Sequence, residues 1–369
     1  MPSYTVPYTA FPLKNAAVKK QLMEAFEAVI DSGRYIMGPE CAAFEQEFAD
    51  YCQAKQATGM ANGTCALHIV LRAAGIGPGD EVITAPNSFI ASAASVALAG
   101  ARPVFADILP DLNIDPAAVE AAITPRTKAL IPVHLSGRPA RMRELSAIAK
   151  KHHLFVLEDA AQAVGARLAG RRVGSWGDAA AFSLHPLKNL HAFGDGGMMT
   201  SNSPDLCGSV AQRRNHGLKN RDQCDFWGFN CRLDEVQAAL LRVQLRELDR
   251  WTAERRRLAA CYHEQLRAFV EVPTEGPDEE HVYQTYVVQC DRRDELRVFL
   301  VENGVEALVH YATPIHLQPA AAELGGKRGD FPASERACAR ILSLPLYPGL
   351  TEEQQAQVIS LIAKFYQGR

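Results

Sequence analysis

Short apolar runs alternate with helix-length segments between about residues 55 and 200, and this alternation constrains the fold more than any other feature. The runs lie at residues 81–85, 102–106, 129–133, 154–157, 179–183 and 198–201. Strands separated by helix-length segments require right-handed crossovers and form a mainly parallel sheet that helices cover on both faces. The pattern therefore predicts an α/β domain, and such sheets bind ligands beyond the carboxyl ends of their strands.

The second half of the chain has a different pattern. Residues 232–269 carry apolar side chains at helical spacing and predict one long helix that bridges two domains. Beyond Pro273 follow a strand-like run at 281–290, a helix at 292–303, a loop through residue 330 and closing helices. We assign residues 1–240 to a large α/β domain with N-terminal helices, and residues 241–369 to a smaller C-terminal α+β domain.

Charge and hydropathy exclude several classes of protein. The chain has 39 Lys and Arg against 42 Asp and Glu, a net charge of −3, and no basic block, so no nucleic-acid partner is expected. The uncharged run at 82–101 contains proline, serines and many alanines, and supplies too little apolar volume for a membrane span. Residues 1–15 lack the cationic segment and apolar run of a secretory signal, so we expect a cytoplasmic protein.

Metal and disulfide chemistry are not expected either. The nine cysteines form no C-x-x-C pair, and the eleven histidines form no H-x-x-x-H pair with a carboxylate as third ligand. We therefore expect reduced, mostly buried thiols and no metal site.

The segment 179–200 contains a single lysine, Lys188, between an apolar run and a glycine-rich turn. A lysine in a partly desolvated site has a lowered pKa, and its neutral amine can form a Schiff base with a carbonyl group. The alternative is a lysine that extends its charged end into solvent, which is the usual state of an isolated lysine.

Two carboxylates, Glu158 and Asp159, stand at the end of an apolar run in FVLEDAAQAVGA. An α/β sheet directs side chains at such positions into its ligand crevice. Pyridoxal phosphate needs an acidic partner that keeps its ring nitrogen protonated, so that the ring can accept electrons from a substrate carbanion. Asp159 is our candidate for this partner, and the alternative is a helix N-cap for the alanine-rich segment that follows.

A phosphate site is suggested by MANGTCALHIVLRAAG, which indicates a strand end, a tight Asn-Gly turn and a helix opened by Thr64. Free N–H groups and the positive end of the helix dipole suit a phosphate at that point. An ordinary turn and cap is the alternative. The order of Thr64, Asp159 and Lys188 along the chain favours the cofactor site.

With these motifs in order, the chain resembles the DegT/StrS-type sugar aminotransferases, a group of fold-type I pyridoxal-phosphate enzymes. The matching segments span nearly the whole length: IMGP at 36–39, ANGTCAL at 61–67, GPGDEVI at 77–83, residues 89–92, EDAAQ at 158–162, FSLHPLKN at 182–189, GDGG at 194–197, NCRLD at 230–234 and residues 310–311. The resemblance implies a fold-type I aminotransferase-like α/β fold with a mainly parallel central sheet flanked by helices.

The resemblance also implies roles for the matching residues. Lys188 would form the Schiff base with pyridoxal 5′-phosphate, and Asp159 would pair with the pyridine nitrogen. Gln162 would hydrogen-bond the phenolic oxygen of the cofactor, and Phe89 would stack on its ring. The groups implied for the phosphate are Thr64, the N–H of Cys65, Ser183 and, from the second subunit of a homodimer with shared active sites, Asn230. Candidates for the substrate opening are His185, His310, Tyr311 and His316, and a structural histidine is the alternative for each of the three histidines.

The implied reaction is transamination from L-glutamate, or glutamine, to a keto sugar. A nucleotide-linked 4-keto or 3-keto hexose is the expected acceptor, and a keto cyclitol or a keto sugar without a nucleotide is the alternative. A non-catalytic regulator with the same fold is opposed by the combination of Lys188, Asp159 and Gln162. A nicotinamide oxidoreductase would need a glycine-rich loop in its first βα unit, which the sequence does not show.

Overall fold

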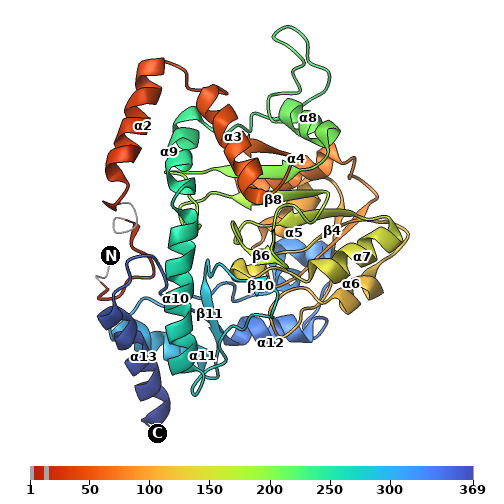
Figure 1. The fold of residues 1–369 in the computed structure, drawn as a ribbon. Coiled ribbons are helices and arrows are strands. Elements are labelled where there is room, and N and C mark those ends of the chain that lie inside the picture. Colours follow the sequence, from red (N-terminus) through yellow and green to blue (C-terminus); the bar gives the residue numbers. More distant parts are fainter. Residues whose placement is uncertain (1–3, 12–15, 369) are drawn as a thin grey trace.

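The computed structural model describes residues 4–11 and 16–368 (Figure 1). Part of the N-terminal segment on which the prediction of a cytoplasmic protein rests, residues 1–3 and 12–15, lies outside the described residues, and that prediction is not tested. Among the described residues, no helix is both long and apolar enough to cross a membrane. The uncharged run at 82–101 instead contributes a strand and a short helix to the sheet domain, as expected of buried structure.

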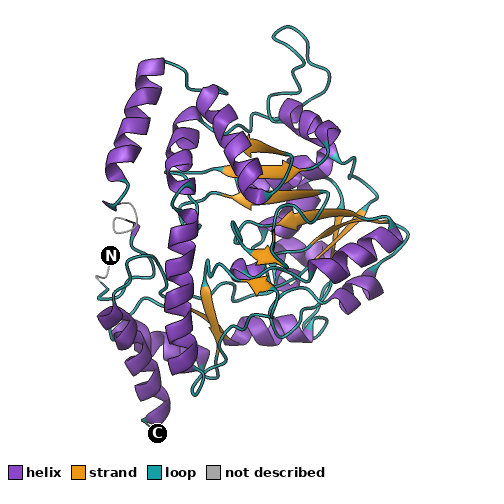
Figure 2. Cartoon of the chain, viewed as in Figure 1, coloured by secondary structure: helices purple, strands orange, loops and turns teal. Residues whose placement is uncertain are grey.

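A seven-stranded sheet forms the centre of the larger part (Figure 2). Its strand order is β1-β9-β8-β5-β4-β2-β3, and β9 runs antiparallel to both of its neighbours while the other pairs are parallel. The strands are β1 (Gln56–Met60), β2 (Glu81–Thr84), β3 (Arg102–Phe105), β4 (Thr127–Ile131), β5 (Phe155–Asp159), β8 (Ala179–Ser183) and β9 (Gly197–Ser201). The predicted α/β fold with a mainly parallel sheet is confirmed.

Helices cover both faces of this sheet, and strand β8 shows how its side chains are divided between them. The ring of Phe182 packs against Phe48 of α3 (Pro39–Cys52), with the ring centroids 5.0 Å apart. The next side chain back, Ala181, packs on the opposite face in the apolar cluster that contains α4 (Gly63–Ala73). Successive side chains of a strand point to opposite faces, so a strand covered on both sides needs an unbroken apolar run. The remaining helices of this part are α5 (Ala91–Leu98), α6 (Pro116–Ala122), α7 (Met142–His152) and α8 (Pro204–Arg213).

The prediction of one long helix over 232–269 is wrong in one respect, because two consecutive helices occupy the segment. Helix α9 (Glu235–Leu245) ends and α10 (Leu248–Leu266) begins after two residues that keep right-handed helical backbone angles. The N–H of Glu247 bonds to the carbonyl of Gln244 three residues earlier, so the turn is tighter than an α-helical turn. The side chain of Gln244 is buried there and donates to the carbonyl of His191 at 2.7 Å. Helical periodicity in the sequence carries no signal for such a local tightening.

The C-terminal part has its own apolar core and small sheets. Strand β11 (Tyr286–Gln289) pairs antiparallel with β12 (Ile341–Leu344), and β10 (Glu279–Glu280) joins the β6–β7 hairpin (Arg167–Leu168 and Arg171–Arg172). Its remaining elements are α11 (Arg293–Glu302), α12 (Pro332–Arg340), α13 (Glu352–Gln367) and the 3₁₀ turns Ile315–Leu317 and Pro319–Leu324. A further 3₁₀ turn, Leu135–Gly137, follows β4 in the sheet part. Strand β11 is shorter than the predicted run at 281–290, and the proposed boundary at residue 240, inside α9, stays a prediction.

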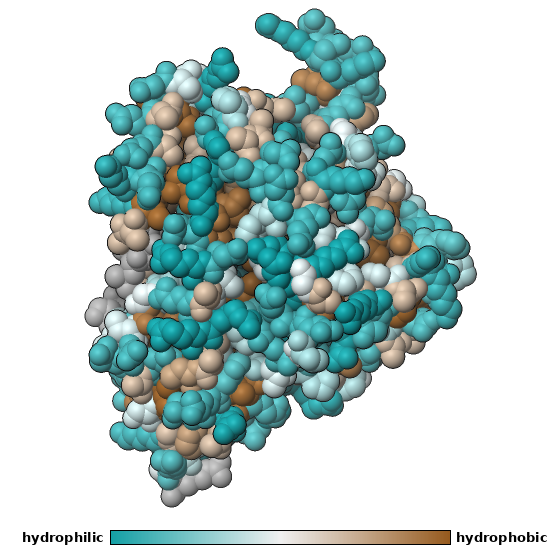
Figure 3. Space-filling view, viewed as in Figure 1, coloured by the Kyte–Doolittle hydropathy of each residue, from teal (hydrophilic) through white to brown (hydrophobic). Residues whose placement is uncertain are grey.

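Helix α2 (Lys19–Ser32) lies at the edge of the molecule beside α9 (Figure 1). Leu22 packs against Leu240 of α9 in a small apolar cluster. An adjoining side of α2 exposes three large apolar side chains: Met23, Phe26 and Ile30 are 59%, 39% and 50% exposed. Figure 3 shows apolar surface beside α2 and α9 on an otherwise largely hydrophilic face.

Candidate active site

The predicted site forms at the carboxyl ends of neighbouring strands. Asp159 is the last residue of β5, and Lys188 follows β8, which pairs directly with β5. The Cα register opposes Asp159 to Ala181, so the two segments leave the sheet side by side. This arrangement brings the carboxylate and the amine together, and their charges influence each other's pKa.

Asp159 is buried and hydrogen-bonded. Its carboxylate accepts the hydroxyl of Ser92 at 2.7 Å and the N–H of Ala161 at 3.2 Å. Burial raises the pKa of Asp159, and the two hydrogen bonds and the charge of Lys188 oppose that rise. A buried negative charge is stabilised by a nearby cation. The Asp159 carboxylate is therefore well suited to pair with a cationic ring nitrogen.

Lys188 lies partly buried in the loop after β8. Burial lowers the pKa of Lys188 to about 8, and the negative charge of Asp159 acts in the opposite direction. Its backbone N–H bonds to the carbonyl of His185 at 2.8 Å, which fixes the turn. An amine with this pKa has a neutral fraction near pH 7 that is much larger than that of a surface lysine.

Glu158 points to the other side of β5 and is engaged in the fold. Its buried carboxylate accepts the backbone N–H groups of Gly174, Trp176 and Gly177 at 2.8–2.9 Å. His134 Nε2 lies 3.0 Å from the same carboxylate, and His134 Nδ1 accepts the N–H of Ala140, which leaves the ring proton on Nε2. Glu158 therefore holds a turn together, and Asp159 alone of this pair faces Lys188.

An amide and two aromatic rings surround the same space. Gln162 accepts the N–H of Ser136 at 2.7 Å through its oxygen, and its NH₂ group donates to the hydroxyl of Tyr311 at 3.2 Å. The rings of Phe89 and Tyr311 lie 5.6 Å apart, and Phe89 is 51% exposed. A large aromatic face left open beside Asp159 is consistent with stacking on a flat ligand.

The start of α4 lies against the end of β8, where the sequence predicts a phosphate site. A Cβ atom on Gly63 would lie 2.9 Å from Cβ of Ser183, so only glycine allows this approach. Within the part of the chain that the structure describes, no backbone acceptor takes the N–H groups of Gly63 or Thr64. The N–H of Cys65 is different, because it donates to the side chain of the N-cap residue Asn62 at 2.8 Å. Gly63 and Thr64 therefore offer free amides, whereas the amide of Cys65 is engaged with Asn62, and its role at a phosphate stays a prediction.

Asn230 lies on the surface of the protomer, in an exposed segment after α8. Its neighbours face inward, since Phe229 packs against His68 of α4 and Cys231 is buried. The backbone bridges Asn215, and the N–H groups of Phe229 and Cys231 bond to the carbonyls of Arg213 and Arg214 at 2.7 and 2.9 Å. An exposed side chain held at a fixed place near α4 can serve this subunit or a second one.

The four residues predicted for the substrate opening separate into two groups. His310 and Tyr311 lie beside Lys188 and Gln162, and burial together with the Lys188 charge lowers the pKa of His310 to about 4. His185 is exposed in the Lys188 loop. His316 is 3% exposed, its Nε2 lies 3.2 Å from Glu335 Oε1, and its ring packs on aromatic rings. These contacts correspond to the alternative given above, a structural histidine.

Three further groups of the site were not predicted from the sequence. Ser92 bonds to Asp159, Ser136 holds Gln162, and the ring of Tyr8 lies 5.6 Å from that of His310. Ser92 lies in the first turn of the helix that follows β2, so its place after a predicted strand was a usable signal. No pattern in the sequence could bring Tyr8 to the site, because the contact depends on the bridge between Val6 and Val305.

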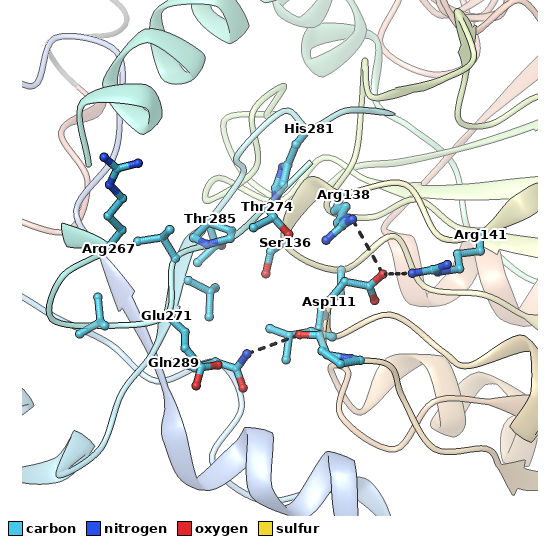
Figure 4. A pocket seen from close by; sticks show the side chains of 17 residues that line it. Asp111, Ser136, Arg138, Arg141, Arg267, Glu271, Thr274, His281, Thr285 and Gln289 are labelled. Carbon is cyan, nitrogen blue, oxygen red and sulfur yellow. Dashed lines mark hydrogen bonds and ion pairs between the residues drawn. The ribbon is translucent and has the colours of Figure 1, made fainter. Parts of the chain in front are cut away.

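A cavity lies elsewhere, between the loops after β3 and β4 and the C-terminal part (Figure 4). Its volume is about 560 Å³, and neither Lys188 nor Asp159 lines it. Asp111 bonds to Arg141 at 3.3 Å and approaches Arg138, which also pairs with Glu279. These charges neutralise one another, and the cavity meets the candidate site at Ser136, which lines the cavity and donates its N–H to Gln162.

Comparisons with known proteins agree with this geometry. The profile of the DegT/DnrJ/EryC1/StrS aminotransferase family matches residues 16–363. The chain is 48% identical to a "pleiotropic regulatory protein" of Geobacillus stearothermophilus, over 95% of both chains. It is 42% identical to dTDP-3-amino-3,4,6-trideoxy-alpha-D-glucose transaminase of Streptomyces venezuelae, over 98% of this chain and 96% of the other. Its structure is similar to that of S. venezuelae DesV in complex with a ketimine intermediate, with a TM-score of 0.95, 42% identity and 99% of both chains covered.

Proposed function

Because this chain belongs to the DegT/DnrJ/EryC1/StrS aminotransferase family and is a pyridoxal-phosphate-dependent sugar transaminase, we propose that Lys188 and Asp159 carry its chemistry. The observation behind this assignment is the partly buried Lys188 amine beside the buried Asp159 carboxylate. Among the described residues, every other lysine is exposed, whereas Lys188 is partly buried.

The residues present fit pyridoxal phosphate. Thr64 and Ser183, with the free amides at the start of α4, would hold its phosphate, because Gly63 leaves room for that approach. Asp159 would accept a hydrogen bond from the protonated ring nitrogen, and Gln162 would donate one to the phenolic oxygen. Phe89 would cover one face of the ring. When bound, the cofactor accepts the amino group and stores the electrons of the substrate carbanion.

Lys188 moves the proton. With a pKa of about 8, its Nζ atom is neutral in part of the molecules near pH 7 and can take the proton from the substrate carbon that carries the amino group. Asp159 keeps its negative charge at the ring nitrogen, aided by the hydroxyl of Ser92. His310, whose pKa is lowered to about 4, stays neutral and adds no competing charge beside Lys188.

We propose a nucleotide-linked 4-keto or 3-keto hexose as the acceptor and L-glutamate, or glutamine, as the donor. The name of the S. venezuelae relative, a dTDP-amino-sugar transaminase, supports this class of acceptor. His185, His310 and Tyr311 are the residues that we expect at the sugar. A keto cyclitol or a keto sugar without a nucleotide is the alternative.

We further propose a homodimer in which Asn230 completes the phosphate site of the partner. The apolar stripe of Met23, Phe26 and Ile30 on α2, and Trp227 at 93% exposure, supply surface that a second copy can bury. Asn230 is exposed and follows Trp227 by three residues, which supports a shared site.

The test is to locate the cofactor chemically. The purified protein should absorb visible light from pyridoxal phosphate bound to Lys188, and borohydride reduction followed by peptide mapping should place the label on Lys188. Lys188→Ala should lose the label and all turnover, whereas Lys128→Ala, which removes an exposed lysine of β4, should change neither. Label on another lysine would overturn the assignment.

Turnover is then tested with the cofactor in its amine form and a panel of keto sugars. The absorption of the aldehyde form should return when the correct acceptor is added. A protein that binds the cofactor at Lys188 but is converted by no amino donor would instead be a regulator, as the name of the G. stearothermophilus relative suggests for that protein.

A further inference from the structure

Two cysteines without a role in the proposed chemistry meet at the start of α4. Cys65 lies in the first turn of α4 and is partly exposed, whereas Cys231 is 2% exposed. Their thiols hydrogen-bond, and their side chains pack in the same apolar cluster. Thr64, the residue before Cys65, belongs to the proposed phosphate site.

A second contact fixes the alignment of these two cysteines. One turn along α4, the ring of His68 meets Phe229 edge to face, with centroids 4.9 Å apart. Cys65 and His68 are three residues apart and share one face of the helix. Phe229 and Cys231 are two residues apart and share one side of an extended segment. The two thiols are therefore held together by packing at two points.

We propose that Cys65 and Cys231 form an oxidisable dithiol, which a low-molecular-weight disulfide of the glutathione class converts into an intramolecular disulfide beside the phosphate site. The formation of this bond is independent of the proposed function, and only its effect on the cofactor rests on that function. Two adjacent thiols, one of them partly exposed to solvent, are the arrangement that such exchange requires.

Cys65 is the attacking group. The hydrogen bond with Cys231 lowers the pKa of the Cys65 thiol, and the same bond together with burial raises the pKa of Cys231. The Cys65 thiolate attacks one sulfur of glutathione disulfide, breaks its S–S bond and releases one glutathione thiolate. That thiolate takes the Cys231 proton, and the Cys231 sulfur attacks the sulfur of Cys65 and releases the second glutathione. Two cysteine thiols are oxidised, and one glutathione disulfide is reduced to two thiols.

The disulfide would change the geometry of the phosphate site, because hydrogen bonds hold the backbone at both cysteines. The sulfurs must approach to about 2.05 Å, which is much closer than two hydrogen-bonded thiols. The N–H of Cys65 is bound to Asn62 at 2.8 Å, and that of Cys231 to the carbonyl of Arg214 at 2.9 Å. We expect the movement that brings the two sulfurs together to displace the residues next to the cysteines, Thr64 and Asn230. Loss of one hydrogen bond to the phosphate should weaken cofactor binding at least about tenfold.

The experiment uses the full-length chain, purified with a reductant that is then removed, with and without bound pyridoxal phosphate. Each sample is incubated with glutathione disulfide, digested without reduction and searched by mass spectrometry for a peptide that links Cys65 to Cys231. Retention of the cofactor after dialysis is followed by its absorption. We expect the linked peptide, slower formation of it when the cofactor is bound, and an at least tenfold weaker retention, all reversed by dithiothreitol.

Three variants make the result specific. Cys65→Ser and Cys231→Ser should each abolish the linked peptide and the loss of cofactor, while Cys224→Ser, at an exposed cysteine, should leave both intact. A stable mixed disulfide on Cys65, or no reaction while Cys224 is modified, would overturn the dithiol. A linked peptide without loss of cofactor would overturn its action on the phosphate. If Thr64→Val and Ser183→Ala also leave cofactor retention unchanged, the proposed phosphate site itself is wrong.

Discussion

At the scale of single residues, the neighbours Glu158 and Asp159 are both buried but have different roles. Glu158 is fully paired within the fold, whereas burial raises the pKa of Asp159 in the ligand-free protein. A raised folded pKa means that the contribution of Asp159 to stability is present below its unfolded pKa and is lost as the pH rises through its folded pKa. Ionisation of Asp159 therefore destabilises the cofactor-free fold.

Asp159→Asn should accordingly keep or raise the thermal midpoint of the cofactor-free protein at pH 7, while transamination falls by about 10²–10⁴-fold. Glu158→Gln is the matched variant, because it removes the same charge one residue away. It should lower the free energy of unfolding by about 3 kcal/mol, since it presents an NH₂ group to backbone donors. Calorimetry and steady-state kinetics measure both effects, and near-normal activity of Asp159→Asn would remove it from the site.

The pKa of Lys188 leads to a second prediction at this scale. The neutral amine attacks the cofactor, so the rate at which cofactor-free protein binds pyridoxal phosphate covalently should rise about tenfold per pH unit and level off near pH 8. The charge of Asp159 raises the pKa of Lys188, so Asp159→Asn should move the plateau to lower pH. Stopped-flow absorption gives these rates, and a rise that continues to pH 10 would show an unperturbed lysine.

At the scale of elements, a buried carboxylate fixes the N-terminus of α3. Glu235, the residue directly after the matched stretch NCRLD, accepts the N–H groups of Gly38, Glu40 and Cys41 at 2.6–3.1 Å. A Cβ atom on Gly38 would lie 2.5 Å from Glu235 Oε1. This contact explains the glycine of the IMGP segment, because the carboxylate occupies the place of a side chain.

Gly38→Ala should therefore lower the free energy of unfolding by about 1–3 kcal/mol, since the new methyl group displaces a pinned carboxylate. Gly208→Ala in α8 is the control, because a Cβ there meets no atom within 4 Å and alanine favours the helix. It should be neutral or stabilising. Chemical denaturation measures the free energy of unfolding of both variants. Equal values would show that the Glu235 side chain moves aside freely.

At the scale of the whole molecule, the apolar stripe on α2 predicts association. Phe26→Ser combined with Ile30→Ser should shift the protein toward monomer in sedimentation velocity and reduce activity, because the proposed dimer buries this stripe. Val298→Ser on α11 removes an equally exposed but isolated apolar side chain and should change neither. A double variant that stays dimeric and active would place the interface elsewhere.

Mixed dimers test whether Asn230 serves the active site of its own subunit or that of the partner. If Asn230 serves the partner, a hybrid of Lys188→Ala and Asn230→Ala subunits has one site with both lesions and one intact site, and recovers up to half of normal activity. If Asn230 serves its own subunit, each site of the hybrid carries one lesion and activity stays low. Both parents are assayed alone, and subunit exchange is verified with a tagged chain. Recovery no greater than either parent would refute the shared site.

The sequence by itself determined the sheet and the order of its chemistry. Strands such as β8 are apolar on both sides, and no other arrangement buries both of their faces. The positions of Lys188 and Asp159 follow from the rule that loops at the carboxyl ends of such strands carry ligands. These features depend on residues close together in the chain, so the pattern is visible without a structure.

Only the tertiary structure decided which hydrogen-bonding groups remain free. Asn62 takes the amide of Cys65, and His316 is bound to Glu335, so two of the predicted site groups are engaged within the fold. The contact between Cys65 and Cys231 joins segments that lie far apart in the sequence. Local patterns specify which groups a segment offers, but the partners come from segments brought near by packing, and packing determines which groups are left for a ligand.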